Sequence, residues 1–214
     1  MVVPMKTLYA VAMLCCIAGA WAYGAGEDAT AYDIPKLDGI RIDGNAQDWG
    51  EQGFRIDLTA DVDGNMKPEQ DFDARYRLGW NKRGLLVLVL VQDEESVESS
   101  NVSQLWEGDG IEIYAGQSKG SPEYYRVSIA PGIDGSHKKL RKDLTDYRKS
   151  KDKMGKLSVR AARSKTENGY VIEALLPWSN LGITPAMGTE VGLQVGANDY
   201  DAEKTRTLYL WYPK

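Results

Sequence analysis

The chain has 214 residues, 43% of them hydrophobic, and a formal net charge of −5, which suits one domain with a sizeable core. Its two cysteines, Cys15 and Cys16, lie side by side near the N-terminus, so thiol catalysis, zinc–cysteine sites and iron–sulfur clusters are excluded from the rest of the chain. The sequence has a single histidine, His137, which is too few for a multi-histidine metal site and is the one histidine that a catalytic triad could use.

An apolar run, TLYAVAMLCCIAGAWA, follows Lys6 and ends in the small-x-small pattern Ala20-Trp21-Ala22. This pattern predicts a secretory signal peptide over residues 1–22. An uncleaved N-terminal anchor is the alternative. Residues 23–36 are predicted to be a polar leader and residues 37–214 the folded domain. We therefore expect an exported protein, periplasmic or extracellular, with no membrane attachment and no disulfide after cleavage.

Short segments of alternating apolar and polar residues follow one another along the domain, and long periodic helices are missing. The segment 85–91 is apolar on both faces, which predicts a central strand that is covered on both sides. Short helical turns are predicted near Asp48-Trp49, at 177–181 and within 142–151. The predicted strands cover 73–80, 85–91, 111–114, 124–130, 169–178, 190–199 and 207–212. The fold is therefore predicted to be all-β, an antiparallel β-sandwich of the jelly-roll or immunoglobulin type.

The polar faces of three predicted strands carry side chains that suit a ligand site. Glu112, Arg126 and Gln194 each point away from the apolar face of their own strand, and glycines flank Gln194. Next to Glu112, Trp106 lies in the acidic turn WEGDG. A sugar ring binds to such a mixture, because its hydroxyls need donors and acceptors and its C–H face packs on an aromatic ring. The structural alternative is a cross-strand ion pair beside an inward-facing tryptophan.

Catalysis is an alternative with less support in the sequence. Glycoside hydrolysis needs two carboxylates at a defined separation, and Glu107, Asp109 and Glu112 are the candidates. A hydrolase of O-glycosyl bonds, or the accessory subunit of one, is therefore kept as an alternative function. A haem or other redox-ligand module is the second alternative, with His137 as its only imidazole. A structural surface domain without a ligand is the third.

Two acidic turns have the oxygen ligands that calcium prefers. The segment DVDGN places Asp61, Asp63 and Asn65 at alternating positions, and Asp199 with Asp201 forms a second such turn. Ordinary acidic turns have the same composition. We therefore predict no required cofactor, and a structural calcium ion at Asp61, Asp63 and Asn65 as an option.

The stretch from 137 to 165 is densely basic, which could indicate binding to nucleic acid. An exported protein rarely meets nucleic acid, and only Tyr147 in this stretch offers a ring for base stacking. We interpret the stretch as a solvated excursion and predict no nucleic-acid partner.

Six segments in order resemble one known family. They are IRIDGNAQDW (40–49), GWNKRGLLVLVLVQD (79–93), LWEGDGIEIY (105–114), YYRVSI (124–129), GYVIEALLPWSNLG (169–182) and VGLQVGANDYD (191–201). This series resembles the family 9 carbohydrate-binding modules, which are β-sandwich domains attached to or associated with enzymes that break down plant polysaccharides. In that family two tryptophans hold the end of a sugar chain over a polar floor.

The resemblance implies roles for individual residues. Trp106 matches the first tryptophan by its W-x-x-D-x-x-E context, and Glu112 and Arg126 match an acid and an arginine of the floor. The floor glutamine departs from the pattern, because its place falls on Gly196 and Gln194 stands two residues earlier. No residue matches the second tryptophan, whose segment lies beyond the last strand of this chain.

The sequence thus predicts a non-catalytic domain that binds a sugar of a plant-type polysaccharide or oligosaccharide and supports carbohydrate catabolism. Trp106 would stack on the sugar, Glu112 and Arg126 would bind hydroxyls, and Gln194 with Asn198 would extend the polar floor. A glycoside hydrolase is the expected protein partner. A platform with one tryptophan predicts weak, millimolar binding, or roughly −4 kcal/mol.

Overall fold

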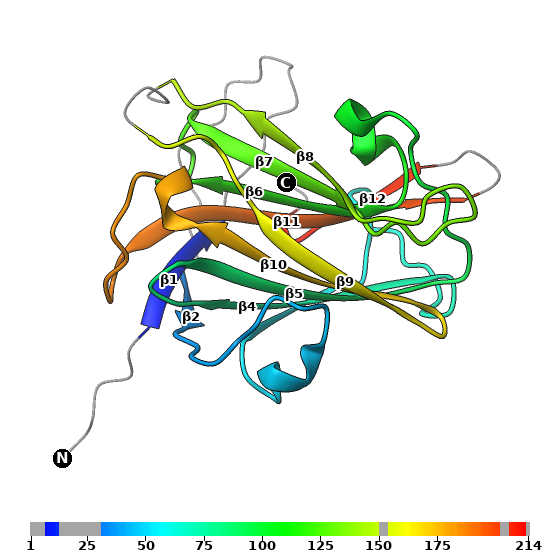
Figure 1. Ribbon diagram of the computed structural model, residues 1–214, viewed down its shortest axis with the longest axis horizontal. Helices are drawn as coiled ribbons and strands as arrows, with labels where there is room; N and C mark the ends of the chain where they lie inside the picture. Colours follow the sequence, from blue (N-terminus) through cyan, green and yellow to red (C-terminus); the bar gives the residue numbers. More distant parts are fainter. Residues whose placement is uncertain (1–6, 13–30, 150–153, 202–205, 213–214) are drawn as a thin grey trace.

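The computed structural model describes residues 7–12, 31–149, 154–201 and 206–212. Two β-sheets pack face to face, which confirms the predicted β-sandwich (Figure 1). The strands are β1 (Thr7–Ala12), β2 (Ala31–Pro35), β3 (Phe54–Leu58), β4 (Phe72–Trp80), β5 (Gly84–Asp93), β6 (Gly110–Gly116), β7 (Tyr124–Ala130), β8 (Arg141–Asp146), β9 (Arg160–Thr166), β10 (Gly169–Pro177), β11 (Glu190–Tyr200) and β12 (Arg206–Leu210). The described helices are short 3-10 turns, η1 (Ala46–Trp49), η2 (Val102–Glu107) and η4 (Trp178–Asn180).

Sheet A has the strand order β2-β1-β11-β6-β7-β8, and sheet B has the order β3-β4-β5-β10-β9. Neighbouring strands are antiparallel except β1 and β11, which run parallel. The first half of β11 pairs with β1 and its second half with β12, so both lie along the same edge of β11. The strands β11, β6 and β7 form the middle of sheet A.

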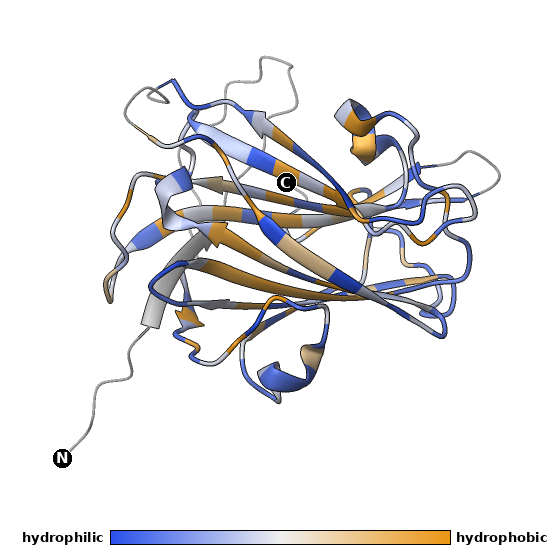
Figure 2. Ribbon diagram, viewed as in Figure 1, coloured by the Kyte–Doolittle hydropathy of each residue, from blue (hydrophilic) through white to orange (hydrophobic). Residues whose placement is uncertain are grey.

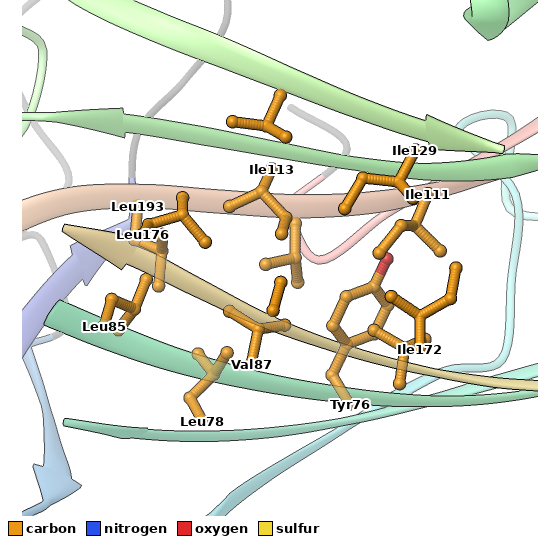
Figure 3. Close-up of a cluster of buried hydrophobic side chains, with 14 of the residues drawn as sticks. Tyr76, Leu78, Leu85, Val87, Ile111, Ile113, Ile129, Ile172, Leu176 and Leu193 are labelled. Carbon is orange, nitrogen blue, oxygen red and sulfur yellow. The ribbon is translucent and has the colours of Figure 1, made fainter. Parts of the chain in front are cut away.

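The main core fills the space between the sheets. Every second residue of the central strands points inward, as the period of a strand requires. Tyr76 and Val87 of sheet B point toward Ile113 and Leu193 of sheet A (Figure 3). The Tyr76 hydroxyl donates a 2.5 Å hydrogen bond to the carbonyl of Gly196, so a buried polar group also ties the two sheets together.

A second apolar cluster covers the outer face of sheet B. Residues of the segment 37–49, among them Ile40 and Trp49, pack on Leu86 and Leu88 of β5. The strand β5 is therefore apolar along nearly its whole length and is covered on both sides, as predicted from the segment 85–91 (Figure 2).

The predicted turns have mixed outcomes. The helical turns η1 and η4 lie where they were predicted. The prediction of a helical turn within 142–151 is wrong for its first residues, because β8 extends to Asp146 and pairs with β7. Leu144 lies opposite Val127 there and packs against the core, so an apolar contact favours the strand. The edge strands β3 and β9 were not predicted.

The structure also differs from the predicted domain limits. Part of the predicted polar leader, residues 31–35, forms β2, and Ile34 is 0% exposed in the main core. The strand β1 lies within the predicted signal peptide and pairs with β2 and β11. Signal cleavage and export stay predictions. Among the described residues, no helix is long and apolar enough to cross a membrane.

Candidate functional site

The outer face of sheet A carries the polar side chains that were predicted from separate strands. Antiparallel pairing sets their positions, since residues that lie opposite one another point to the same side. Two neighbouring rows across β11, β6, β7 and β8 are Gly196–Glu112–Ser128–Asp143 and Gln194–Tyr114–Arg126–Thr145. The register therefore brings Glu112, Arg126 and Gln194 together on one surface, as predicted.

Glu112 and Arg126 form an ion pair, and each also makes hydrogen bonds to neighbouring side chains. The Glu112 carboxylate accepts hydrogen bonds from the Tyr114 hydroxyl at 2.9 Å and the Ser128 hydroxyl at 3.2 Å. Nη1 of Arg126 lies 3.5 Å from Oε1 of Glu112, and the two side chains are 16% and 2% exposed. Nη2 of Arg126 donates to Thr145 at 3.2 Å. The Nε atom of Arg126 is buried and has no hydrogen-bond partner among the described residues.

Trp106 lies on η2, which packs against β6, β7, β8 and β11. Asn101 caps this turn, since its side chain accepts a hydrogen bond from the Ser103 amide. Leu105 is the buried anchor of the turn at 2% exposure, whereas Trp106 is half-buried. The indole is therefore not packed into the interior.

Arg206 links the indole to the sheet. Its guanidinium carbon lies 5.0 Å from the centre of the Trp106 ring, and its Nε donates a 2.9 Å hydrogen bond to the Asn198 side chain. Arg206 lies opposite Tyr200 in the β11–β12 pair, on the same face as Asn198. Trp106, Arg206 and Asn198 thus lie on the face that carries Glu112. Sequence reasoning missed Arg206, because the predicted strand began one residue later, at Thr207.

The side chain of Gln194 already makes hydrogen bonds within the protein. Its side chain is 0% exposed, its Nε2 donates to the Tyr212 carbonyl at 2.7 Å, and its Oε1 accepts from the Tyr212 amide at 3.2 Å. Gln194 thus holds the segment that follows β12 in place. Its role as a sugar contact stays a prediction, and it would require this segment to move.

Gly196 occupies the position where the family places its floor glutamine. A Cβ atom there would lie 2.6 Å from Cδ2 of Leu210 and 2.7 Å from the carbonyl of Tyr209. Because β12 lies so close, a larger side chain at Gly196 has no room. Of the side chains predicted to form the floor, Glu112, Arg126 and Asn198 also lie on this face.

The carboxylates considered for catalysis differ in their surroundings. Asp109 is 0% exposed, and its two oxygens accept hydrogen bonds from the amides of Val97 and Tyr200. Burial raises the pKa of Asp109 to about 9. Glu107 is exposed and accepts a 2.8 Å hydrogen bond from Gln104. Asp109 thus fixes the loop before β6 and does not reach solvent.

Asp109 belongs to an acidic centre at the ends of β4, β5 and β11. It consists of Asp71, Asp93, Glu94, Asp109, Asp199 and Asp201. The Lys67 ammonium lies 2.7 Å from Asp199, 2.8 Å from Asp201 and 3.2 Å from Asp71. Burial raises the pKa of Asp199 to about 6, even with this ammonium beside it. Lys67 is the cation that the structure shows among these carboxylates.

The turn predicted to bind calcium is closed by its own hydrogen bonds. Oδ1 of Asp61 accepts from the amides of Asp63 and Asn65, both at 2.8 Å, and Oδ2 accepts from the Asn65 side chain at 3.0 Å. These hydrogen bonds, that of the Asn65 side chain first, lower the pKa of Asp61. A cation would compete with these N–H groups, so the fit is poor. Calcium binding here stays a prediction.

The basic stretch is only partly a solvated excursion. Arg148 is 5% exposed and donates to the Asn180 carbonyl at 2.6 Å, and Arg141 pairs with the buried Glu98 at 2.9 Å. His137 holds its Nδ1 2.9 Å from Asp134. Two of these cations therefore stabilise loops, and the surroundings of His137 are polar, which does not suit a haem ligand.

Several known proteins are similar to this chain. Residues 42–212 match the model of the carbohydrate family 9 binding domain-like family. The endo-1,4-beta-xylanase A of Thermoanaerobacterium saccharolyticum is 27% identical over 134 residues, which are 63% of this chain and 10% of the xylanase. The endo-1,4-beta-xylanase A of Thermotoga neapolitana is 24% identical over 185 residues, 82% of this chain and 16% of the enzyme. The chain thus spans only a small part of these relatives.

Solved structures show the same fold. A family 9 carbohydrate-binding module from Caldicellulosiruptor kristjanssonii in complex with cellotriose aligns with a TM-score of 0.57 at 16% identity, covering 83% of this chain and 82% of the module. The module from the same organism in complex with glucose aligns with a TM-score of 0.58 at 18% identity and 83% coverage of both chains. With the family model matching well over half of the sequence, the chain belongs to the carbohydrate family 9 binding domain-like family.

Proposed function

We propose that this protein is an exported, non-catalytic domain that binds a sugar on the outer face of sheet A. The observation that carries this proposal is the Glu112–Arg126 couple, which lies on the same face as the half-buried indole of Trp106. Glu112 orients the Arg126 guanidinium, which is 16% exposed and would offer N–H donors to sugar hydroxyls. Trp106 would pack on the C–H face of the ring.

The class of sugar is inferred from the relatives. The similar modules from Caldicellulosiruptor kristjanssonii are in complex with cellotriose and glucose, and the longer proteins that match this chain include endo-1,4-beta-xylanases. We therefore propose a sugar from a plant polysaccharide as the ligand, and a role in supporting a glycoside hydrolase. Export is proposed from the sequence of residues 1–22 alone. N-terminal sequencing of secreted protein should begin at Tyr23.

The contact between Trp106 and Arg206 bears on affinity. A guanidinium lies over one face of the indole, so a sugar stacks on the other face or displaces it. Displacement at an exposed site costs about 0.5–1 kcal/mol. This cost is consistent with weak binding, in the millimolar range or roughly −4 kcal/mol.

The test is retention of the mature protein on immobilised cellulose and xylan. Trp106→Ala should lose retention and keep its melting temperature, because the indole is only half-buried. Val102→Ala is the matched control, since Val102 lies on the same turn and is 50% exposed. Wild-type retention by Trp106→Ala would refute the indole platform.

The enzyme alternative is tested on the same materials. Release of reducing ends that Glu112→Gln abolishes would favour hydrolysis over binding. We expect no release of reducing ends, because the carboxylate oxygens of Asp109 and Glu112 already accept hydrogen bonds from other groups of the protein.

A further inference from the structure

Arg206 is held in a defined position beside the proposed sugar platform. The Trp106 ring contacts its guanidinium at 5.0 Å, and Asn198 accepts the hydrogen bond from its Nε at 2.9 Å. Asn198 thus occupies the Nε side of the guanidinium, which lies over the indole ring. Its two Nη atoms make no hydrogen bond to any residue that the structure describes, and Arg206 is exposed. The end of the guanidinium therefore remains open to a ligand.

The charge of Arg206 is also not neutralised within the described part of the chain. No described carboxylate lies within 4.0 Å of it, whereas Arg126 on the same face lies 3.5 Å from Glu112. Glu107, on the same turn as Trp106, is exposed and accepts a hydrogen bond from Gln104. Glu112 is the predicted floor acid, and its side chain is 2% exposed and paired with Arg126. Arg206 is thus an exposed positive charge at the edge of the site.

The chemistry of a guanidinium indicates what would bind there. Two parallel N–H groups at the end of an arginine match the two oxygens of a carboxylate, and such charge-assisted pairs are stronger than hydrogen bonds between neutral groups. A neutral sugar hydroxyl needs neither the charge nor the paired donors. An arginine that is already oriented by an aromatic ring and an amide loses less conformational freedom on binding.

We propose that the site prefers glycans that carry a uronic acid, with the sugar carboxylate bound end-on by the Nη atoms of Arg206 beside Trp106. This inference rests on the proposed sugar-binding function and specifies its ligand. Sugar hydroxyls would still reach Arg126 and Asn198, which lie on the same face. The carboxylate adds selectivity to the stacking of the sugar on Trp106.

The test compares two matched ligands by titration calorimetry: xylotriose, and xylotriose that bears one glucuronic acid branch. We expect wild-type protein to bind the acidic sugar about five- to tenfold more tightly, a difference of roughly 1 kcal/mol. Raising the salt concentration from about 50 mM to about 500 mM should reduce this preference, because screening weakens exposed charge pairs. Arg206→Gln should bind both sugars equally. Arg206→Lys should keep only part of the preference, since it keeps the charge and loses the paired donors.

The outcomes separate this inference from the function on which it rests. Equal binding of both sugars by wild type, or an acidic preference that survives Arg206→Gln, would overturn the inference alone. Failure of both sugars to bind would remove the proposed function together with the inference. Asn198→Ala is a second variant, because it removes the anchor of Arg206 and leaves its charge. Because Asn198 also belongs to the proposed floor, both sugars should bind more weakly, and the measured quantity is the ratio of the two affinities, which should fall toward one.

Discussion

The indole N–H of Trp49 donates a 2.7 Å hydrogen bond to the carboxylate of Glu173, a residue 124 positions later in the chain. The same carboxylate accepts from the amides of Asp43 at 2.9 Å and Gly44 at 2.7 Å. Glu173 is 0% exposed and lies on the outer face of β10. One buried side chain therefore fixes the segment 40–49 on sheet B, where this segment covers the apolar residues of β5 and β10.

Glu173→Gln should destabilise the protein strongly. The glutamine keeps the shape but loses the charge, and its NH₂ group would face donors instead of accepting from them. Hydrogen bonds to charged groups are worth about 1.5–3 kcal/mol each, so we expect a loss of about 2–4 kcal/mol. Urea unfolding measures this loss. Glu167→Gln is the control, since Glu167 is exposed in the turn before β10 and should cost less than about 0.5 kcal/mol. Equal losses of unfolding free energy in the two variants would contradict the role of Glu173 in holding the segment 40–49.

Alternation of apolar and polar residues was sufficient to predict the central strands. The strand β7 has the predicted limits, and β5 is covered on both faces as its composition indicated. Edge strands carry a weaker pattern. The strand β9, RAARSKT, has one neighbour and a half-buried surface, so its sequence shows little alternation. The strand β8 was not predicted, because its charged residues resemble those of a loop.

The polar floor was predictable because side-chain direction alternates along a strand. Parity alone placed Glu112 and Arg126 on one face, and the register brought them together. The partners of Gln194 could not be predicted, because they are backbone atoms of Tyr212 that reach it through the path of the chain after β12. Arg206 was missed for a similar reason, since its neighbour Trp106 is distant in sequence.

Gly196→Ala should destabilise the fold through a steric clash. The new Cβ would lie 2.7 Å from the Tyr209 carbonyl and 2.6 Å from the Leu210 side chain. Backbone atoms of β12 cannot shift without weakening the β11–β12 pair, so we expect a loss of about 1–3 kcal/mol. Gly135→Ala is the control, because nothing lies within 4 Å of its Cβ position. Thermal unfolding of both variants measures the difference, and a normal melting temperature for Gly196→Ala would show that β12 is less closely packed.

Calcium should have little effect through the turn of Asp61, Asp63 and Asn65. The Asp61 oxygens already accept three N–H hydrogen bonds from within the turn. We therefore expect Asp63→Asn and wild type to show the same change in melting temperature when calcium replaces a chelator. A stabilisation by calcium that disappears in Asp63→Asn would instead establish the calcium site predicted from the sequence.

The acidic centre makes stability depend on pH in an unusual direction. Burial raises the pKa of Asp93 to about 8 and that of Asp109 to about 9. Both values lie above the ordinary value of an aspartate, so the folded protein keeps protons that the unfolded chain releases. Their contribution to stability is fully present below the unfolded pKa, near pH 4, and is lost as the pH rises through the folded values. The free energy of unfolding should therefore fall between about pH 4 and pH 9.

Asp93→Asn should remove part of this dependence. Oδ1 of Asp93 accepts a 3.0 Å hydrogen bond from the Glu95 amide, and the asparagine keeps that acceptor. Oδ2 is buried without a partner among the described residues, so the variant loses no hydrogen bond there. At pH 4 wild type and variant should be equally stable, because the aspartate is already neutral. At pH 8 the variant should be more stable by on the order of 1–3 kcal/mol. Urea unfolding at several pH values, with a chelator present, measures how the free energy of unfolding of each protein changes with pH. Asp57→Asn is the control, because Asp57 is exposed. If the free energy of unfolding depends on pH equally in Asp93→Asn and wild type, Asp93 is ionised in the folded protein and the raised pKa is wrong.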